Sequence, residues 1–353
     1  MSEPAAQSPN SGPWWVWADV LGLYAVATAL VWMKLFAWSC RARMSWEEYA
    51  VLGSVVWILY MAERIIDGLV WEGLRQERHT IAARRWRGLL SLILALSAGS
   101  ALLLLYRIPQ FVSMTGLKLG AGVAVYFMLT WVIRKNLAGL TGGLVACGCM
   151  AVALMQGNLL RMDPGAGASE LWPHLWRGAL AGVLLTVVLV YMRRSGAPAP
   201  WLLPRKFVSG WIFAMGTALA PFSHLMLWYE LLFSPPVLIL GAVCAVKSIG
   251  IRLVEAAREE QPNFEVALIQ RLYPWIMIIV TTGALTEWYA SYAIARPLHG
   301  AAAAAALLLV ILYALRRRIS VPLYRALAAA AVIVPAAAAI VPAAAATAFF
   351  LKK

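Results

Sequence analysis

Apolar residues in this chain gather in blocks, and short polar or basic segments separate one block from the next. The blocks match the roughly 17–25 apolar residues that a helix needs to cross a bilayer. A soluble helix would instead carry one apolar stripe along an otherwise polar surface. The pattern predicts eleven candidate membrane-spanning helices at 14–38, 46–66, 88–106, 112–133, 136–157, 173–192, 207–228, 233–254, 268–290, 299–315 and 321–350.

The composition agrees with this pattern, because 62% of the residues are hydrophobic and only 13% are charged. A soluble domain has about half apolar and about a quarter charged residues. We therefore predict an all-α fold, a polytopic transmembrane helical bundle of about 9–11 spans. The whole chain 1–353 is expected to form a single integral membrane domain, with a polar N-terminal tail at 1–13 and transmembrane helices within 14–350. The tail has no Lys or Arg, which argues against a cleavable secretory signal.

Basic residues concentrate in alternate loops between the predicted spans. Most of them follow the spans 46–66, 112–133, 173–192, 233–254 and 299–315. Cytoplasmic loops collect Lys and Arg, so this alternation predicts a cytoplasmic N-terminus and cytoplasmic loops after the second and eighth spans. The net charge of +14 resides in these short loops and not on one polar face, so we expect no nucleic-acid partner.

A first acidic pair lies at the end of the second span. Glu63 and Asp67 are four residues apart, so a helix presents both carboxylates on one face, one turn apart. Such a pair suits Mg²⁺, which accepts one or two carboxylates and completes its shell with water and phosphate. Alternatively, both carboxylates pair with Arg64 and with loop arginines at the membrane surface.

The loop that follows this pair is rich in arginine and contains a histidine. Guanidinium groups bind phosphate well because they offer forked hydrogen-bond donors. The residues Arg78, His79, Arg84 and Arg85 are therefore candidate diphosphate ligands. The same arginines also contribute to the excess of positive charge in cytoplasmic loops, which orients the chain in the membrane.

A second acidic pair, Glu255 and Glu259, stands at the end of the eighth span with the same spacing. Two such pairs at one membrane face can converge on a single metal-bound diphosphate. In the alternative interpretation, Arg252 or Arg258 neutralises Glu255 in an ordinary ion network at the helix end.

Other polar residues near the span ends are interpreted as interfacial groups or hydrogen-bonding partners between helices. They are Asp19, His224, Glu230 and Glu287. The four cysteines lie in or beside apolar blocks and are interpreted as packing residues. The histidines form no recognisable motif with Ser or Cys, and the chain has no Walker-type phosphate loop and no dinucleotide fingerprint.

The acidic motif from Glu63 to Asp67, followed by the basic stretch 78–85, resembles the UbiA-type membrane prenyltransferase superfamily, in particular its poorly characterised bacterial branch. The segment 205–216 is similar to the start of that family's fifth helix, and 323–328 looks like its final helix. Arg64 departs from the family pattern, since it stands where the first aspartate of the N-D-x-x-D motif is expected.

The resemblance implies a UbiA-like protein of the bacterial inner (cytoplasmic) membrane that transfers a prenyl group from a prenyl diphosphate to a lipid-soluble acceptor. Mg²⁺ would be the cofactor, and membrane lipid would surround the substrate. The implied ligands are Glu63, Asp67, Glu255 and Glu259 for the metal, and Arg78, His79, Arg84 and Arg85 for the diphosphate.

Two alternatives stay open at this point. A non-catalytic UbiA-like subunit of a membrane-protein complex would use its carboxylates in structural ion pairs. A transporter of small solutes or lipids would place charges or broken helices near mid-membrane depth, whereas the charges here crowd the helix ends. The enzyme predicts four carboxylates facing one cavity, and the subunit predicts that each carboxylate pairs with an arginine.

Overall fold

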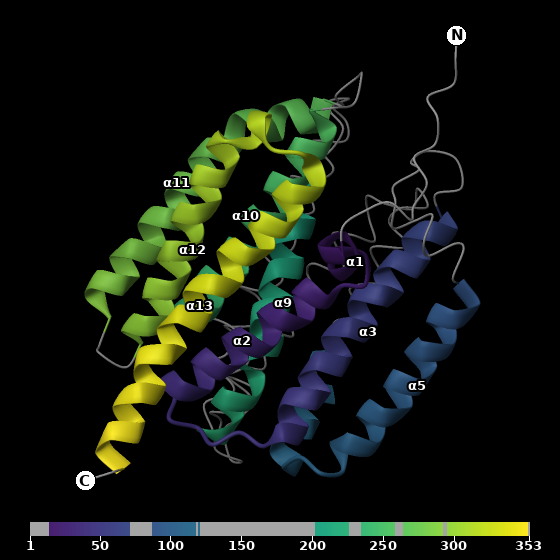
Figure 1. Ribbon diagram of the computed structural model, residues 1–353, viewed down its shortest axis with the longest axis vertical. Helices are drawn as coiled ribbons and strands as arrows, with labels where there is room; N and C mark the ends of the chain where they lie inside the picture. The colour runs from purple at the N-terminus through teal and green to yellow at the C-terminus, as the bar shows by residue number, and fades with distance from the viewer. Residues whose placement is uncertain are drawn as a thin grey trace, which may run out of the picture.

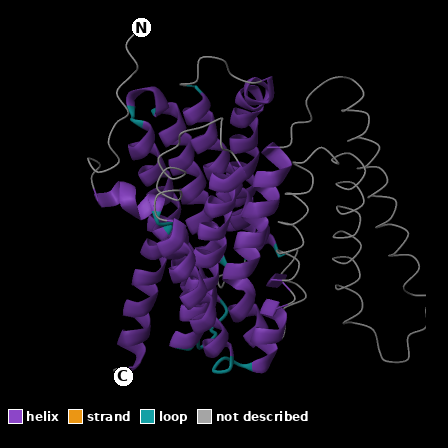
Figure 2. Cartoon of the chain, turned by 90° about the vertical axis from the view of Figure 1, so that its right-hand side faces the viewer, coloured by secondary structure: helices purple, strands orange, loops and turns teal. Residues whose placement is uncertain are grey.

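The computed structural model describes residues 14–70, 87–117, 119–120, 202–225, 234–257, 264–291 and 295–351. Over these residues the chain forms helices and loops, without a strand (Figure 2). The elements are α1 (Trp14–Val20), α2 (Leu23–Ser39), α3 (Trp46–Val70), α5 (Arg87–Leu105), α9 (Leu202–His224), α10 (Pro235–Ala256), α11 (Phe264–Ala290), α12 (Arg296–Ala314), the 3-10 turn η3 (Arg316–Arg318) and α13 (Val321–Leu351).

Four of these helices are long and apolar enough to cross a membrane. They are Pro235–Ala256, Val266–Ala290, Arg296–Ala314 and Val321–Val341. The segments Leu23–Ser39 and Ala95–Leu105 are also apolar but shorter. The described part of the chain is therefore all-α, as predicted, and four of its helices are suited to cross a membrane. The predicted spans 136–157 and 173–192, and most of 112–133, lie outside the described residues.

The first predicted span is not one continuous helix, and in this respect the prediction over 14–38 was wrong. The chain breaks between α1 and α2 at Gly22, whose φ of 71° is left-handed. Glycine adopts this conformation without steric cost, since it has no Cβ. The ring of Tyr60 on α3 packs directly against the space that a Cβ would need. The Trp57 indole Nε1 also donates to the Leu21 carbonyl at 3.0 Å, which anchors the break to α3.

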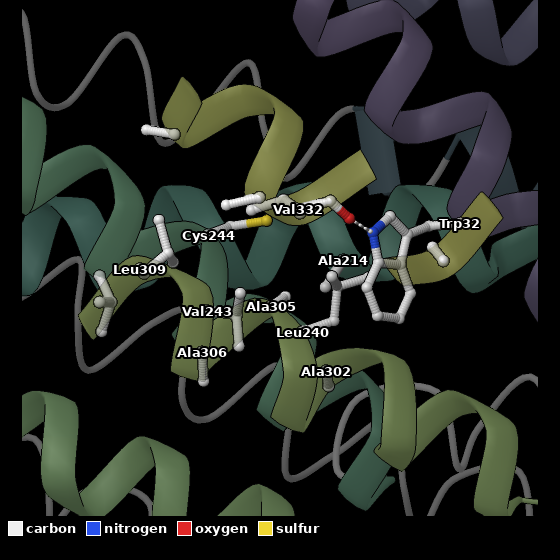
Figure 3. Close-up of a cluster of buried hydrophobic side chains, with 14 of the residues drawn as sticks. Trp32, Ala214, Leu240, Val243, Cys244, Ala302, Ala305, Ala306, Leu309 and Val332 are labelled. Carbon is white, nitrogen blue, oxygen red and sulfur yellow. Dashed lines mark hydrogen bonds between the residues drawn. The ribbon is translucent and has the colours of Figure 1, made fainter. Parts of the chain in front are cut away.

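The core is centred on α10, which packs against α9, α11, α12 and α13 (Figure 1). A close helix approach in this core joins α9 and α10 at Gly210 and Gly241, where a Cβ on either glycine would meet backbone atoms of the other helix. Small side chains of α12, such as Ala302 and Ala305, keep the neighbouring helices close as well. Figure 3 shows this region with the buried indole of Trp32, which donates to the Val332 carbonyl of α13 at 3.1 Å.

Candidate functional site

Four charged side chains from three helices meet at one end of the bundle. We call them the Arg325 cluster; its members are Asp19 of α1, Arg252 and Glu255 of α10, and Arg325 of α13. Arg325 donates from Nε to Glu255 Oε1 at 2.8 Å and from Nη1 to Asp19 Oδ2 at 3.1 Å. A further bond joins Arg325 Nη2 to the same oxygen of Glu255. The guanidinium therefore ties the broken N-terminal segment to two long helices.

Burial and charge balance explain why this cluster holds together. The side chains of Arg325, Glu255 and Asp19 are 17%, 16% and 21% exposed. Charges removed this far from water need partners, because desolvation of an unpaired charge costs several kcal/mol. Arg252 lies 3.8 Å from Glu255, so two guanidinium groups balance two carboxylates. The break at Gly22 lets α1 turn so that Asp19 reaches Arg325.

The C-terminal end of α3 lies at this same end of the bundle. Its residues Trp57 and Tyr60 contact the break between α1 and α2, only a few residues from Asp19 (Figure 1). The backbone of Glu63 and Asp67 belongs to the turns of α3 that follow. The first acidic motif and the end of α10 thus lie at the same end of the protein, although α3 packs against α2, α5 and α9 and not closely against α10.

Several of the predicted ligands fall where the structure gives no side-chain description. The side chains of Glu63 and Asp67 are outside it, and so are Arg78, His79, Arg84, Arg85 and Glu259 in their entirety. Within the described ranges, no group of three or more His, Cys, Asp or Glu side chains is placed to hold a metal ion.

Glu255 is the predicted metal ligand whose surroundings are described. Its carboxylate is occupied by Arg325 and approached by Arg252, so its geometry fits the ion-network interpretation of this helix end. Arg252 was named as a partner from the sequence, but Arg325 was not. The available signal was an arginine inside the alanine-rich apolar block 321–350, since a charge in such a block requires a partner.

A second polar contact joins α3 and α9 at the opposite end of the bundle. The His224 ring nitrogen Nε2 lies 2.8 Å from Glu48 Oε1. Glu48 also helps to cap the start of α3, because its other carboxylate oxygen accepts a hydrogen bond from the Ser45 amide at 2.7 Å. Phe111 stands edge-on to the His224 ring. As expected from the sequence, Asp19 and His224 both act as partners between helices.

Comparisons with known proteins find no significant match to a family model, a curated protein or a solved structure. The likeness to UbiA-type proteins therefore rests on the short motifs at 63–67, 78–85, 205–216 and 323–328. The last of these motifs contains Arg325, the residue at the centre of the cluster.

Proposed function

We propose that this protein is a UbiA-like membrane protein that binds a prenyl diphosphate at the end of the bundle marked by the Arg325 cluster, and transfers its prenyl group to a lipid-soluble acceptor. One observation carries the proposal. The C-terminal end of α3, whose backbone includes Glu63 and Asp67, lies at the same end of the bundle as the C-terminus of α10 (Figure 1). This end of the bundle thereby carries acidic residues of both α3 and α10, next to apolar helices that suit an isoprenoid chain.

The ion pair between Glu255 and Arg325 bears on which residues are proposed as metal ligands. A carboxylate held by Arg325 is not available to a metal without breaking that pair, so Glu255 fits a structural role better than a ligand role. The proposed metal ligands are then Glu63 and Asp67, with Glu259. Bound Mg²⁺ would supply positive charge against the leaving diphosphate. The proposed diphosphate ligands stay Arg78, His79, Arg84 and Arg85.

A second candidate function is a non-catalytic subunit of a membrane-protein complex. The pairing of Glu255 with Arg325 favours it, because this is the arrangement expected when carboxylates stabilise the fold. Arg64 also favours it, since a cation within the acidic motif repels a metal ion. In this case the motif 63–67 would be part of an ion network and would bind no diphosphate.

Binding of a radiolabelled prenyl diphosphate to purified protein, with and without Mg²⁺, separates the two candidates. The proposal expects Mg²⁺-dependent binding that is lost in Asp67→Ala. Glu47→Gln is the matched control, because Glu47 lies on the same helix at its other end and should leave binding unchanged. No binding to folded wild-type protein at any Mg²⁺ concentration would overturn the proposal and support the non-catalytic subunit.

A further inference from the structure

The turn between α12 and α13 consists of three consecutive arginines, Arg316–Arg318, and they are not equivalent. Arg316 faces inward: its guanidinium carbon lies 4.0 Å from the centre of the Tyr313 ring, and Nη1 donates to the Tyr313 carbonyl at 2.9 Å. Arg317 and Arg318 are exposed and form no ion pair with any residue of the described ranges. Two of the three charges are therefore accessible to a ligand from outside the described fold.

The surroundings of the turn fix its depth relative to a membrane. Both helices that it joins are apolar enough to span a bilayer. Large apolar side chains next to the turn are exposed on both helices: Ile311 by 55%, Leu315 by 43%, Leu323 by 40% and Leu327 by 39%. In a membrane-spanning helix, such exposed apolar side chains face lipid chains. The turn thus lies where the hydrocarbon ends and the lipid headgroups begin.

We infer that Arg317 and Arg318 form a binding site for the phosphate group of an anionic phospholipid, whose acyl chains lie along the exposed apolar faces of α12 and α13. Guanidinium groups match a phosphodiester because they donate two parallel hydrogen bonds. The adjacent apolar wall at Leu315 and Leu323 distinguishes a lipid from a soluble phosphate, which has nothing to place there. This inference does not depend on the proposed prenyl chemistry.

Two contacts fix the backbone of the turn that carries this site. The Arg318 amide donates to the Leu315 carbonyl at 2.9 Å, which closes the turn. Arg316 fixes the start of the turn against Tyr313, a residue that lies in the core and contacts Tyr273 of α11. The backbone that carries the two outer arginines is therefore fixed, so only their side chains need to be ordered when a headgroup binds.

Native mass spectrometry in detergent tests the inference by measuring the Kd of the first phosphatidylglycerol and of the first phosphatidylcholine bound. Each arginine near an anionic lipid surface contributes about fivefold, so the double variant Arg317→Gln/Arg318→Gln should weaken phosphatidylglycerol binding by about 30-fold. Phosphatidylcholine binding should change little. The matched control is Arg43→Gln/Arg107→Gln, two exposed arginines at the opposite end, and it should bind phosphatidylglycerol like the wild type.

Three outcomes would overturn the inference. The first is wild-type affinity for phosphatidylglycerol in a double variant whose elution profile and helix content match the wild type. The second is an equal loss of affinity in the control pair, which would indicate general charge attraction. The third is displacement of the lipid by inorganic phosphate at millimolar concentration, which would identify a soluble-anion site in place of a lipid site.

Discussion

Adding a single methyl group at Gly210 should push α9 and α10 apart. A Cβ at this position would collide with the Gly241 carbonyl oxygen and would lie 3.0 Å from the Ala245 amide nitrogen. Both neighbours are backbone atoms of α10, so no side chain can rotate away to make room. The reverse substitution, Gly241→Ala, meets the same obstacle, because its Cβ would lie 2.9 Å from the Cα of Trp211.

The size of the effect follows from the packing around this contact. Ordinary van der Waals distances would be restored only if the helices moved apart by about 1 Å, and overpacking of this kind costs about 2 kcal/mol. That cost corresponds to a roughly 30-fold change in the unfolding equilibrium constant. The gain in helix propensity from Gly to Ala offsets less than about 1 kcal/mol of it.

Gly216→Ala is the matched control, because Gly216 lies on the same helix and a Cβ there has no heavy atom within 4 Å. Thermal or denaturant-induced unfolding in detergent should rank Gly216→Ala equal to or above wild type, with Gly210→Ala and Gly241→Ala below it. Equal stability of Gly210→Ala and Gly216→Ala would refute the close approach of α9 and α10.

Three further predictions concern other contacts. Arg325→Met should lower the free energy of unfolding by about 3 kcal/mol, because both carboxylates of its cluster lose the guanidinium that bonds to them. Replacing those carboxylates by amides in the same variant should restore part of the loss in denaturant titrations. Gly250→Ala should destabilise the protein, since its Cβ would collide with the Tyr273 hydroxyl and lie 3.0 Å from the Tyr324 hydroxyl. Tyr273→Phe should relieve part of the collision in a double-mutant cycle of unfolding free energies. Burial raises the pKa of the Cys40 thiol to about 11. In a variant whose other cysteines are alanine, maleimide labelling of Cys40 should therefore be slow at pH 7 and should accelerate about tenfold per pH unit until the pH approaches that pKa, since only the thiolate reacts.

The apolar blocks predicted the C-terminal half of the protein well. The predicted spans 233–254, 268–290, 299–315 and 321–350 correspond to α10, α11, α12 and α13 within a few residues at most ends. The prediction succeeded because a membrane-spanning helix needs only length and apolarity, and both are properties of a single stretch of sequence. The break at Gly22 was missed, because a lone glycine in an apolar block is compatible with a continuous helix and only the contact with Tyr60 shows why the chain turns.

Pairings between distant residues could not be read from the sequence. Asp19 and Arg325 are separated by 306 positions, and Glu48 and His224 by 176. The residue types alone indicated that each buried charge needs a partner, but the choice of partner depends on which helices lie side by side. The local spacing of Glu255 and Glu259 was therefore equally compatible with a metal site and with an ion pair.

Arg325 favours the ion-pair interpretation for Glu255, because its guanidinium uses three donor nitrogens on only two carboxylates. A carboxylate bound in this way stabilises the bundle, so Glu255→Gln should reduce the free energy of unfolding whether or not the protein binds a diphosphate. Asp67→Ala, in contrast, is expected to act on diphosphate binding, because Asp67 is a proposed metal ligand. If instead Glu255→Gln abolished Mg²⁺-dependent binding and left stability unchanged, the cluster would be part of the ligand site, and Arg325 would hold Glu255 in place for the metal.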